Sequence, residues 1–407
     1  MAEEMRIVLR NYGKIDPSKI EDYIAQGGYK SLTKATSMNK EDLITDITKS
    51  NLRGRGGAGF NCGMKWNFAY SAEADQKYVI CNADEGEPGT YKDRLIMEGD
   101  PHSLIEGMAI CGYAIGSTKG YIYLRGEYPF IVDILNKAIG QAKDKGYLKD
   151  FDIEVRLGAG AYVCGEETAL IESIEGKRGE PRFKPPYPPV IGLWGQPTIV
   201  NNVETFANIP VIVEKGGDWY ASIGDAAYPG TKVFTLTGDV VNKTFFEVPT
   251  DTTVRDIIFG LGGGIPNGKK FKAVQIGGTS GAFIPESLLD TKVAFDAMSN
   301  IGATLGSGAT FVLDESRDVV DVVCRITEFF KHESCGKCTP CREGTYRMAQ
   351  LVGKINKGEG SIADEYLLKK LGMVMSYACL CGLGQAAPAP VLTTMLHFKD
   401  DYEKKFQ

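Results

Sequence analysis

The sequence of 407 residues lacks long apolar runs and any broad excess of basic charge. No segment approaches the ~20 apolar residues that a membrane-spanning helix needs. The N-terminus, MAEEMRIVLRN, lacks the basic region and apolar core of a signal peptide. We therefore expect a cytoplasmic protein without a membrane span. A net charge of -6 and a pI near 5.4 provide no basic surface for phosphate backbones, which argues against a nucleic-acid partner.

Cysteine is plentiful, with ten residues, and its distribution is uneven. Because the cytosol keeps thiols reduced, we expect thiols or metal ligands rather than disulfides. Five cysteines stand singly and mostly among apolar residues, and for these we expect small buried side chains. They are Cys62, Cys81, Cys111, Cys164 and Cys324. The other five follow residue 334.

The segment ESCGKCTPCREGT spaces Cys335, Cys338 and Cys341 as C-x2-C-x2-C. On one tight loop, three thiolates at this spacing can occupy three corners of a 4Fe-4S cluster. Helical segments at about 343–356 and 361–378, joined by KGEG, return the chain to its starting end. We expect Cys381, in a flexible CGLG context, to be the fourth ligand, with Cys379 as the alternative. A structural zinc site is the alternative to the cluster, but zinc sites usually use two CxxC pairs.

Hydrophobic patterns divide the chain into three predicted domains, 1–231, 232–312 and 313–407. In the first, the β-rich runs KYVICNA, GYIYLRG and IEVRLGAG alternate with helical stretches, which indicates an α/β domain with a largely parallel sheet. The Pro- and Gly-rich segment 178–202 predicts an ordered surface loop or a linker. The second is predicted to be a small α+β module. The third has apolar residues at helical spacing and predicts a helical bundle.

The run GRGGAGF at 54–60 matches G-x-G-x-x-G, but a helical pattern precedes it where a dinucleotide fingerprint requires a strand. The usual Rossmann interpretation therefore fails. Glycines at 54, 56, 57 and 59 still allow backbone N–H groups to approach an anionic or planar ligand. Lys65 and the aromatic residues Phe60, Trp66 and Phe68 suit a phosphate with a stacked ring. A merely structural turn is the alternative.

Polar side chains follow two strand-like runs. Asn82, Asp84, Glu85 and Glu87 come directly after an apolar strand, and α/β folds bind ligands at strand carboxyl ends. Solvated turn acids are the alternative. Tyr162, Gly165, Glu166 and Glu167 stand at a predicted helix start, where the two acids could instead complement the helix dipole. Asn201 and Asn202 offer amides that can bond the edge of a ring.

Several motifs occur together in a specific order: LRGRGGAGF, KW at 65–66, CNADEGEPGTYKDR, CGEETAL, KPPYPP, VNNVET and ESCGKCTPCREGT. Over nearly its whole length the chain resembles the flavoprotein NADH-oxidising subunit of respiratory complex I. It equally resembles the diaphorase subunits of NAD-dependent or electron-bifurcating hydrogenases and formate dehydrogenases. The resemblance implies a Rossmann-like FMN domain, a ubiquitin-like β-grasp module and a four-helix bundle carrying one 4Fe-4S cluster.

The resemblance also implies roles for individual residues. Glu85 joins the cofactor-binding segment, and Phe60, Phe68, Glu87, Glu167, Lys184 and Tyr187 would line the NADH site. The FMN site would comprise Gly54, Arg55, Gly56, Gly57, Ala58, Gly59, Lys65, Asn82, Asp84, Tyr162, Gly165, Glu166, Asn201, Asn202 and Thr205. The chain departs from the family pattern at Asn61-Cys62, which puts a thiol near the flavin pocket, and mildly at Tyr187, where phenylalanine is frequent.

In this family NADH passes a hydride to FMN, and single electrons then leave through the cluster. The hydride step needs no general acid or base, which fits a chain with only three histidines, His102, His332 and His397. We expect redox partner subunits, including one with a 2Fe-2S cluster. The segments GGTSGAFIP and LGSGATFVLDES favour the hydrogenase or bifurcating branch over complex I. Preference for NADPH and a zinc-binding scaffold remain alternatives.

Overall fold

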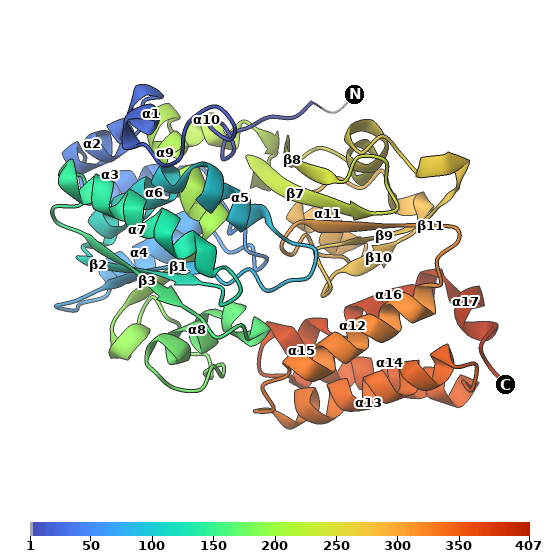
Figure 1. Ribbon diagram of the computed structural model, residues 1–407. Helices are drawn as coiled ribbons and strands as arrows, with labels where there is room; N and C mark the ends of the chain where they lie inside the picture. The colour runs from blue at the N-terminus through green and yellow to red at the C-terminus, as the bar shows by residue number, and fades with distance from the viewer. Residues whose placement is uncertain (1–2) are drawn as a thin grey trace.

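The computed structural model describes residues 3–407 and begins with an α/β unit (Figure 1). Its four strands are all parallel and lie in the order β3-β2-β1-β4. Helices α6 and α7 cover one face, and α8 lies on the other. The strands are β1 Tyr78–Ala83, β2 Lys119–Leu124, β3 Asp152–Leu157 and β4 Thr198–Asn202. The helices are α1 Ile20–Ala25, α2 Lys30–Ser37, α3 Lys40–Lys49, α4 Cys62–Ser71, α5 Lys92–Gly99, α6 Pro101–Ile115, α7 Pro129–Asp144, α8 Glu167–Ile174, α9 Val203–Lys215 and α10 Gly217–Ala221.

Local sequence explains the central helix of this unit. Asp100 caps the N-terminus of α6 by accepting a hydrogen bond from Ser103 N, and Pro101 occupies the first turn, where it sacrifices no helical bond. Gly116 ends the helix in the left-handed conformation. Between these signals nearly every side chain is buried, so α6 is the core helix of the unit.

One strand contradicts the sequence prediction. The segment 178–202 was expected to be loop or linker throughout, but its last five residues form β4, which pairs with β1. The prolines that argued against a strand end at Pro197, one residue before β4 begins. β4 is short and lies at the edge of the sheet, where β1 is the one strand that it pairs with.

A second, five-stranded sheet has the order β10-β9-β11-β7-β8, with β11 and β7 parallel and the other pairs antiparallel. It spans Thr231 to Asp314, against the predicted 232–312. Its strands are β7 Thr231–Gly238, β8 Thr244–Pro249, β9 Phe271–Ile276, β10 Ala282–Ile284 and β11 Ala309–Asp314, with a π-helix at Asp256–Leu261 and α11 at Phe295–Asn300. A short hairpin of β5 Gly224–Asp225 and β6 Tyr228–Pro229 precedes it.

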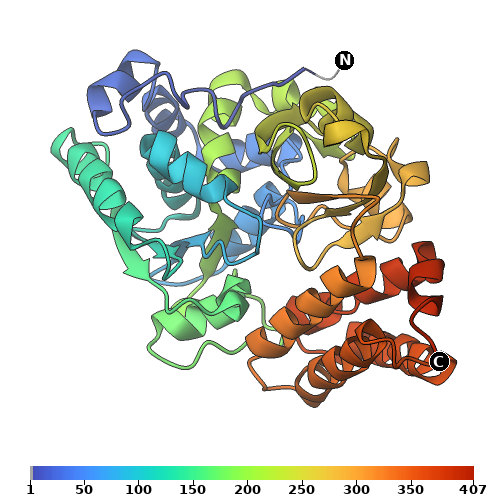
Figure 2. The same cartoon turned by 45° about the vertical axis from the view of Figure 1, so that its right-hand side comes forward.

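The remaining chain is helical (Figure 2). Its elements are α12 Val319–Glu333, α13 Thr339–Asn356, α14 Ile362–Ala378, α15 Gly382–Ala386, α16 Ala389–His397 and α17 Lys399–Glu403. Apolar side chains of these helices share one continuous core with the α8 face of the first sheet. The helical unit is therefore packed against the α/β unit. Within residues 3–407, no helix is both long enough and apolar enough to cross a membrane.

Candidate redox site at the carboxyl edge of the first sheet

The carboxyl ends of β1 and β4 bring several predicted residues together. Strand register pairs Asn82 with Asn202. The Asn82 side chain donates from Nδ2 to the carbonyl of Gly165 (2.8 Å) and accepts at Oδ1 from Asp84 N (3.1 Å). The start of the α8 segment is thereby tied to the end of β1, as expected for a ligand site at strand ends.

Asp84 carries an unsatisfied buried atom. Its Oδ2 has no hydrogen-bond partner. Burial raises the pKa of Asp84 to about 7, although the positive charge of Arg125 opposes the rise. An isolated buried carboxyl oxygen is costly, so this position suits a ligand that donates a hydrogen bond to it.

The glycine loop is closed by its own backbone and by the second sheet unit. Gly54 N donates to Phe60 O (2.8 Å), and Arg55 N donates to Thr205 Oγ1 (2.9 Å). Gly59 has a φ of +64°, and a Cβ there would lie 2.7 Å from the ring of Phe295. Three loop residues instead face solvent, namely Gly56, Ala58 and Phe60. The loop therefore offers backbone and one aromatic ring on its open side.

Arg55 does not face that open side. Its guanidinium is fully buried and donates to Arg53 O, Pro229 O, Thr231 O and the hydroxyl of Tyr220. It also stacks on Tyr228, 4.3 Å from the ring centre. The side chain thus fastens the glycine loop to the chain entering the second sheet, and only the backbone of Arg55 remains near the loop surface.

Two lysines converge on the acids at the start of α8. Glu167 accepts from Lys65 (2.8 Å), and Glu166 accepts from Lys184 (2.7 Å), which also lies 3.4 Å from Glu167. Although burial opposes it, the charges of Lys65 and Lys184 hold the pKa of Glu167 below its usual range. Glu166 also caps α8 by accepting from Thr168 N (2.9 Å) and Ala169 N (3.1 Å). Glu166 therefore stabilises the N-terminus of α8, as the helix-dipole interpretation expected, and it also forms an ion pair with Lys184.

Three predicted aromatic residues, Phe60, Phe68 and Tyr187, are exposed. Their exposure agrees with the prediction that they present stacking faces to a planar group.

Glu85 and Glu87 have protein partners. Glu85 is buried and accepts from Asp93 N (2.8 Å) and Arg94 N (3.1 Å) at the start of α5. Burial raises the pKa of Glu85 to about 8. Glu87 accepts from the hydroxyl of Tyr162, from Thr279 Oγ1 (2.8 Å) and from Ser280 N (2.9 Å). Glu87 thus links the first sheet to the β9–β10 turn.

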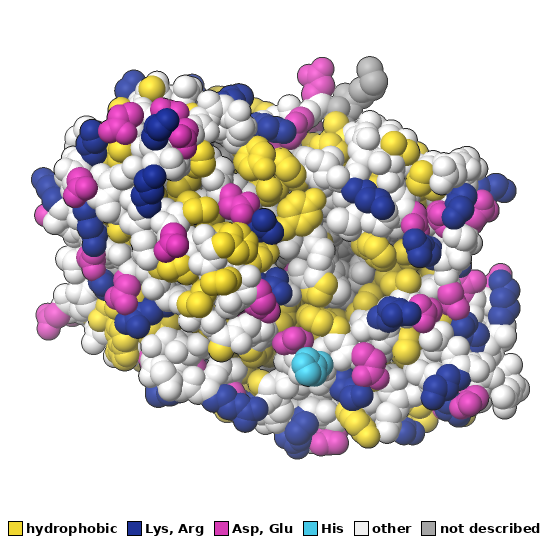
Figure 3. Space-filling view, viewed as in Figure 1, with side chains coloured by type: hydrophobic (Ala, Val, Ile, Leu, Met, Phe, Trp, Pro, Cys, Tyr) yellow, Lys and Arg dark blue, Asp and Glu magenta, His cyan; other side chains and the backbone are white. Residues whose placement is uncertain are grey.

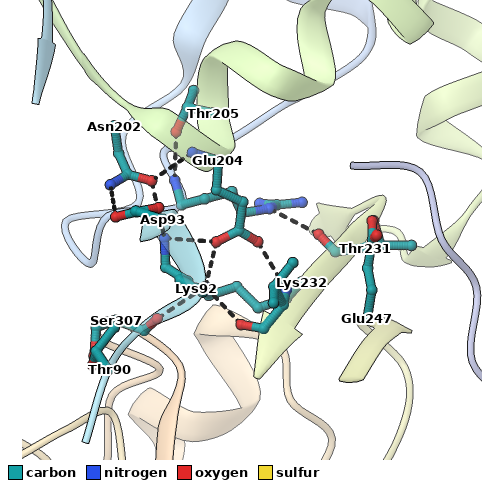
Figure 4. A network of polar contacts seen from close by, with 12 residues as sticks. Thr90, Lys92, Asp93, Asn202, Glu204, Thr205, Thr231, Lys232, Glu247 and Ser307 are labelled. Atoms are coloured by element: carbon teal, nitrogen blue, oxygen red, sulfur yellow. Dashed lines mark hydrogen bonds and ion pairs between the residues drawn. The ribbon is translucent and has the colours of Figure 1, made fainter. Parts of the chain in front are cut away.

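Behind the glycine loop lies a buried ionic network whose charged residues were not among the predicted site residues (Figure 4). Lys92 contacts Asp93 (2.6 Å), Asn202 (3.0 Å) and Glu204 (2.9 Å), and Lys232 of β7 donates to the same Glu204 (2.7 Å). Asn202 also donates to Asp93 (2.7 Å). The amide of Asn202 is thereby held by protein groups on both of its polar atoms. Lys92, Asp93 and Glu204 all belong to motifs noted above, which was the available signal.

Cys62 and Asn201 lie beneath the loop. Burial raises the pKa of the Cys62 thiol to about 12, so this thiol is protonated at neutral pH. The Asn201 amide is best oriented with its oxygen accepting from the indole N–H of Trp66 (3.1 Å) and its nitrogen donating to Val200 O (3.1 Å). The thiol expected near the flavin pocket is accordingly a buried, protonated group. Cys81, Cys111 and Cys164 are buried as expected, and Cys324 is partly exposed.

The cysteine segment differs in one respect from the predicted loop. Helix α13 begins at Thr339, so Cys341 lies in its first turn, while Cys335 and Cys338 precede it. Helices α13 and α14 do return the chain: Leu380 N lies 3.5 Å from Cys338 Sγ. Burial raises the pKa of the Cys381 thiol to about 11, and backbone N–H groups of Leu383 and Gly384 oppose the rise.

Cys379 also reaches this end of the helices. Its thiol hydrogen-bonds with Cys341, which lowers the pKa of Cys341 to about 6. A Cβ at Gly384 would lie 2.7 Å from Cys379 Sγ and 3.0 Å from Cys341 Cβ, so this corner is tightly packed. Across residues 3–407, no group of three or more His, Cys, Asp or Glu side chains is spaced to hold a single metal ion.

Two reciprocal contacts join the cysteine segment to the segment that carries Lys184. Arg178 Nη2 donates to Cys335 O (2.6 Å), and Lys337 Nζ donates to Pro181 O (2.9 Å). The predicted nucleotide residues and the predicted cluster residues are therefore neighbours in space, although about 150 residues separate them in sequence.

A separate cavity of about 780 Å³ lies between Pro88-Gly89, the second sheet and α12. The space-filling view in Figure 3 shows that the surface of the molecule is hollowed near its centre on this face. The polar lining of the cavity is largely engaged within the protein: Gln275 Nε2 donates to Thr279 O and Gly281 O, both at 3.1 Å. None of the predicted cofactor residues lines it.

Comparison with known proteins matches both halves of this arrangement. Residues 47–211 match the Nuo51 FMN-binding domain, and residues 321–405 match the NADH-ubiquinone oxidoreductase-F iron-sulfur binding region. The corresponding NADH-quinone oxidoreductase subunit of Aquifex aeolicus is 46% identical over 98% of this chain and 94% of its own length. The chain belongs to the NADH-quinone oxidoreductase-F family. The family includes a hydrogenase subunit, HndC of the NADP-reducing hydrogenase of Solidesulfovibrio fructosivorans, 49% identical over 98% of this chain and 83% of that one.

Solved structures of NAD+-reducing [NiFe]-hydrogenase carry the same fold as this member of the oxidoreductase-F family. The H2-reduced form superposes with a TM-score of 0.87 at 38% identity, covering 93% of this chain. The air-oxidized form gives 0.88 at 35% identity, covering 100%. This chain spans 65% and 68% of those two chains.

The cofactors of the oxidoreductase-F family, FMN and a 4Fe-4S cluster, fit the residues that are present. The orphaned Asp84 Oδ2 suits a hydrogen-bond donor of the ligand, and FMN offers the hydroxyls of its ribityl chain and one ring N–H, while the open glycine loop leaves room for a flat or phosphorylated group. Cysteine thiolates are the donors that iron-sulfur clusters prefer, and four flank one end of the α13–α14 pair with a fifth beside them.

Proposed function

We propose that this protein is the NADH-oxidising flavoprotein subunit of a multi-subunit redox complex. The observation that carries the proposal is the junction between Lys184, Glu166 and Glu167 on one side and the cysteine segment on the other, linked by Arg178 and Lys337. A two-electron site and a one-electron relay are useful to each other only at short range, and this junction makes them neighbours.

The flavin would be held at the strand ends. Asn82 orders the turn after β1, Asp84 accepts from a ligand donor, and the backbone of Gly54 to Gly59 admits a flat or phosphorylated group without a Cβ in the way. Bound FMN supplies the acceptor for a hydride and releases electrons singly. Asn202 and Arg55 hold this cradle from behind through the contacts described above, and we assign them to its support.

The nucleotide would lie over Phe60 and Phe68, with Tyr187 at the edge. Lys65 and Lys184 neutralise Glu166 and Glu167, so the pocket wall is polar but close to electrically balanced. Because Glu87 is engaged with Tyr162, Thr279 and Ser280, its role is to hold the wall formed by the β9–β10 turn. The protein's task in this step is orientation, which can supply much of the rate.

Cys335, Cys338, Cys341 and Cys381 would hold the 4Fe-4S cluster. Cys381 is favoured over Cys379 because its CGLG context provides a flexible turn that can bring the sulfur to the cluster, whereas Cys379 is packed tightly against Cys341 and Gly384. Lys337 and Arg342 add positive charge beside the segment, and Arg342 Nη1 donates to Gly336 O (2.7 Å).

We classify the second sheet as a ubiquitin-like β-grasp module and α12, α13, α14 and α16 as a four-helix bundle, with the first unit as the Rossmann-like FMN domain. The strand order and the hairpin-helix-strand sequence support the first assignment. We place the protein in the cytoplasm, which suits ten free cysteines. A hydrogenase-type complex with a 2Fe-2S partner is the assembly we favour, because the segments GGTSGAFIP and LGSGATFVLDES point to that branch. Respiratory complex I is the alternative, since relatives of both kinds span most of the chain.

The test is an assay of the protein purified with its cofactors. It should be brown-yellow, contain FMN and acid-labile sulfide, and reduce ferricyanide or a viologen dye with NADH. A colourless protein after reconstitution with iron, sulfide and FMN would sink the proposal, and zinc without sulfide would establish the scaffold alternative. Because one relative is named as NADP-reducing, steady-state rates with NADH and NADPH should be compared.

A further inference from the structure

The cavity of about 780 Å³ lies where the three units of the chain meet, and we call it the junction cavity. The first unit contributes Pro88-Gly89, the second sheet contributes one of its faces, and α12 contributes a further wall. Ligand cavities typically enclose about 300–1,000 Å³ and occur preferentially at junctions between domains. The junction cavity has the size and the place of a small-molecule site, although it contains none of the residues assigned to FMN, NADH or the cluster.

Phe311 on β11 presents an aromatic ring to the junction cavity. Its side chain is 36% exposed, and strand register places Thr237 and Gln275 beside it, on the same face of the sheet. Val322 and Ile326 of α12, which lie one helical turn apart on one helix face, add apolar lining. An exposed ring among apolar side chains offers its flat face to another ring. The shape and chemistry of this lining suit a flat ring compound.

Gln275 supplies a polar group at the edge of that ring. The residue is only 4% exposed, and its side-chain nitrogen is engaged by Thr279 O and Gly281 O. Its side-chain oxygen is an exception in the polar lining: it accepts no hydrogen bond from residues 3–407, yet it is not fully enclosed. A buried carboxamide oxygen without a partner is costly. An N–H or O–H group of a ligand would therefore be bound there.

The charged side chains of the junction cavity balance one another. Four of them line it, two of each sign, and each already has an ion-pair partner. The pairs are Arg317 with Asp239, Asp318 with Lys405 and Asp321 with Arg325, at 2.6, 2.7 and 3.1 Å. An ionised ligand would find no unpaired counter-charge among these four. The lining therefore favours a neutral ligand.

Two segments of the lining also hold Glu87, which we have assigned to the wall of the proposed nucleotide pocket. Thr279 Oγ1 donates to Glu87 (2.8 Å), and a Cβ on Gly278 would lie 2.3 Å from Glu87 Cγ. Pro88 follows Glu87 directly in the chain. A ligand in the junction cavity would thus rest against both segments that fix the position of Glu87.

We propose that the junction cavity binds a neutral, flat ring compound with an N–H or O–H donor, and that its occupancy is coupled to NADH binding. The ring lies on Phe311, and the donor bonds the side-chain oxygen of Gln275. Binding itself is independent of the proposed function, whereas the coupling rests on it, because the coupling acts through Glu87. Such a coupling is reciprocal, so the ring compound and NADH change each other's affinity by the same factor.

The test of binding uses the full-length protein with its FMN and cluster, in saturating NAD+ to occupy the nucleotide pocket. Indole is the probe, titrated by ligand-observed NMR. 1-Methylindole, which lacks the N–H donor, should bind about fivefold more weakly, as should the anion indole-3-carboxylate. Phe311→Ala should weaken indole binding about tenfold. Phe259→Ala is the matched control, because Phe259 is 39% exposed on the second sheet unit but lies outside the cavity. It should bind indole as wild type does.

Val322→Trp blocks the junction cavity from α12 without touching the sheet, and it should also abolish indole binding. Saturating indole should change the KM for NADH by about twofold or more in wild type and in Phe259→Ala, but not in Phe311→Ala.

Equal affinity for indole and 1-methylindole would overturn the proposed site, as would unchanged indole binding in both Phe311→Ala and Val322→Trp. Loss of indole binding in Phe60→Ala alone would place the probe in the nucleotide pocket and equally overturn it. Bound indole with an unchanged KM would overturn the coupling. A wild-type protein that fails to oxidise NADH would instead overturn the proposed function and leave the binding test intact.

Discussion

At the residue scale, Asp84 links the fold to its proposed ligand. Its raised pKa, about 7, means that the folded flavin-free protein binds a proton there more tightly than the unfolded chain does. The stability that Asp84 contributes is therefore complete below pH ~4 and is lost as the pH rises toward 7. Asp84→Asn, which carries no charge, should stabilise the flavin-free protein by up to roughly 4 kcal/mol above pH 7.

Denaturant unfolding of both flavin-free proteins between pH 5 and 8.5 measures this difference. The advantage of Asp84→Asn should widen up to about pH 7 and then stay constant. A difference that is the same at every pH would show that Asp84 does not titrate as described. The same variant should bind FMN more weakly than wild type in a fluorescence titration, because the acceptor for a ligand donor is weakened.

The two C-terminal cysteines also differ at this scale. Cys381→Ser should abolish the cluster's electron paramagnetic resonance signal and lower the iron content, whereas Cys379→Ser should retain both. The reason is that Cys381 lies in the CGLG turn at the start of α15, whereas Cys379 is packed against Cys341 and Gly384. FMN content provides the control, since neither substitution lies at the strand ends. The reverse result would make Cys379 the fourth ligand.

At the scale of elements, pattern and capping signals in the sequence were sufficient for most helices and for β1, β2 and β3. They failed for β4, where proline content outweighed a five-residue strand, and for the start of α13, where Pro340 fits the first helical turn. The placement of Asn82 and Glu167 at one edge was expected, because each follows a strand-like run and α/β folds bind ligands at strand carboxyl ends. The engagement of Arg55, Asn202 and Glu87 by protein groups was not, because their partners are remote in sequence.

The glycine loop gives a prediction at this scale. Gly59→Ala should destabilise the protein by about 2–4 kcal/mol, because alanine would have to adopt a positive φ and its Cβ would displace the ring of Phe295. FMN affinity should fall with it, since the loop moves. Gly140→Ala is the matched control: a Cβ there meets nothing within 4 Å, and Gly140 lies inside α7. It should stabilise by about 0.5–1 kcal/mol. Thermal unfolding and flavin titration measure both, and equal effects of the two substitutions would contradict the account.

At the scale of the whole molecule, contacts between units hold the flavin cradle. Phe295 covers Gly59, the β9–β10 turn holds Glu87, and Arg55 reaches the chain that enters the second sheet. No local pattern predicts such contacts, because each joins residues that belong to different units. The flavin site is therefore a property of the assembled chain, and loosening the second sheet should loosen the cradle.

Lys232 tests that dependence. It lies on β7 and pairs with Glu204 at the start of α9, and both side chains are fully buried. Lys232→Met would leave Glu204 with Lys92 alone, so the cost should be about 3 kcal/mol, at the low end for a broken buried pair. Adding Glu204→Gln should restore part of this stability, because the uncompensated charge is gone. Urea unfolding of the four proteins gives the coupling energy, and FMN release measured alongside should follow the same order. Arg255→Met, which breaks an exposed ion pair with Asp290, should change neither quantity. Additive effects of the Lys232 and Glu204 substitutions would mean that this pair does not join the two units.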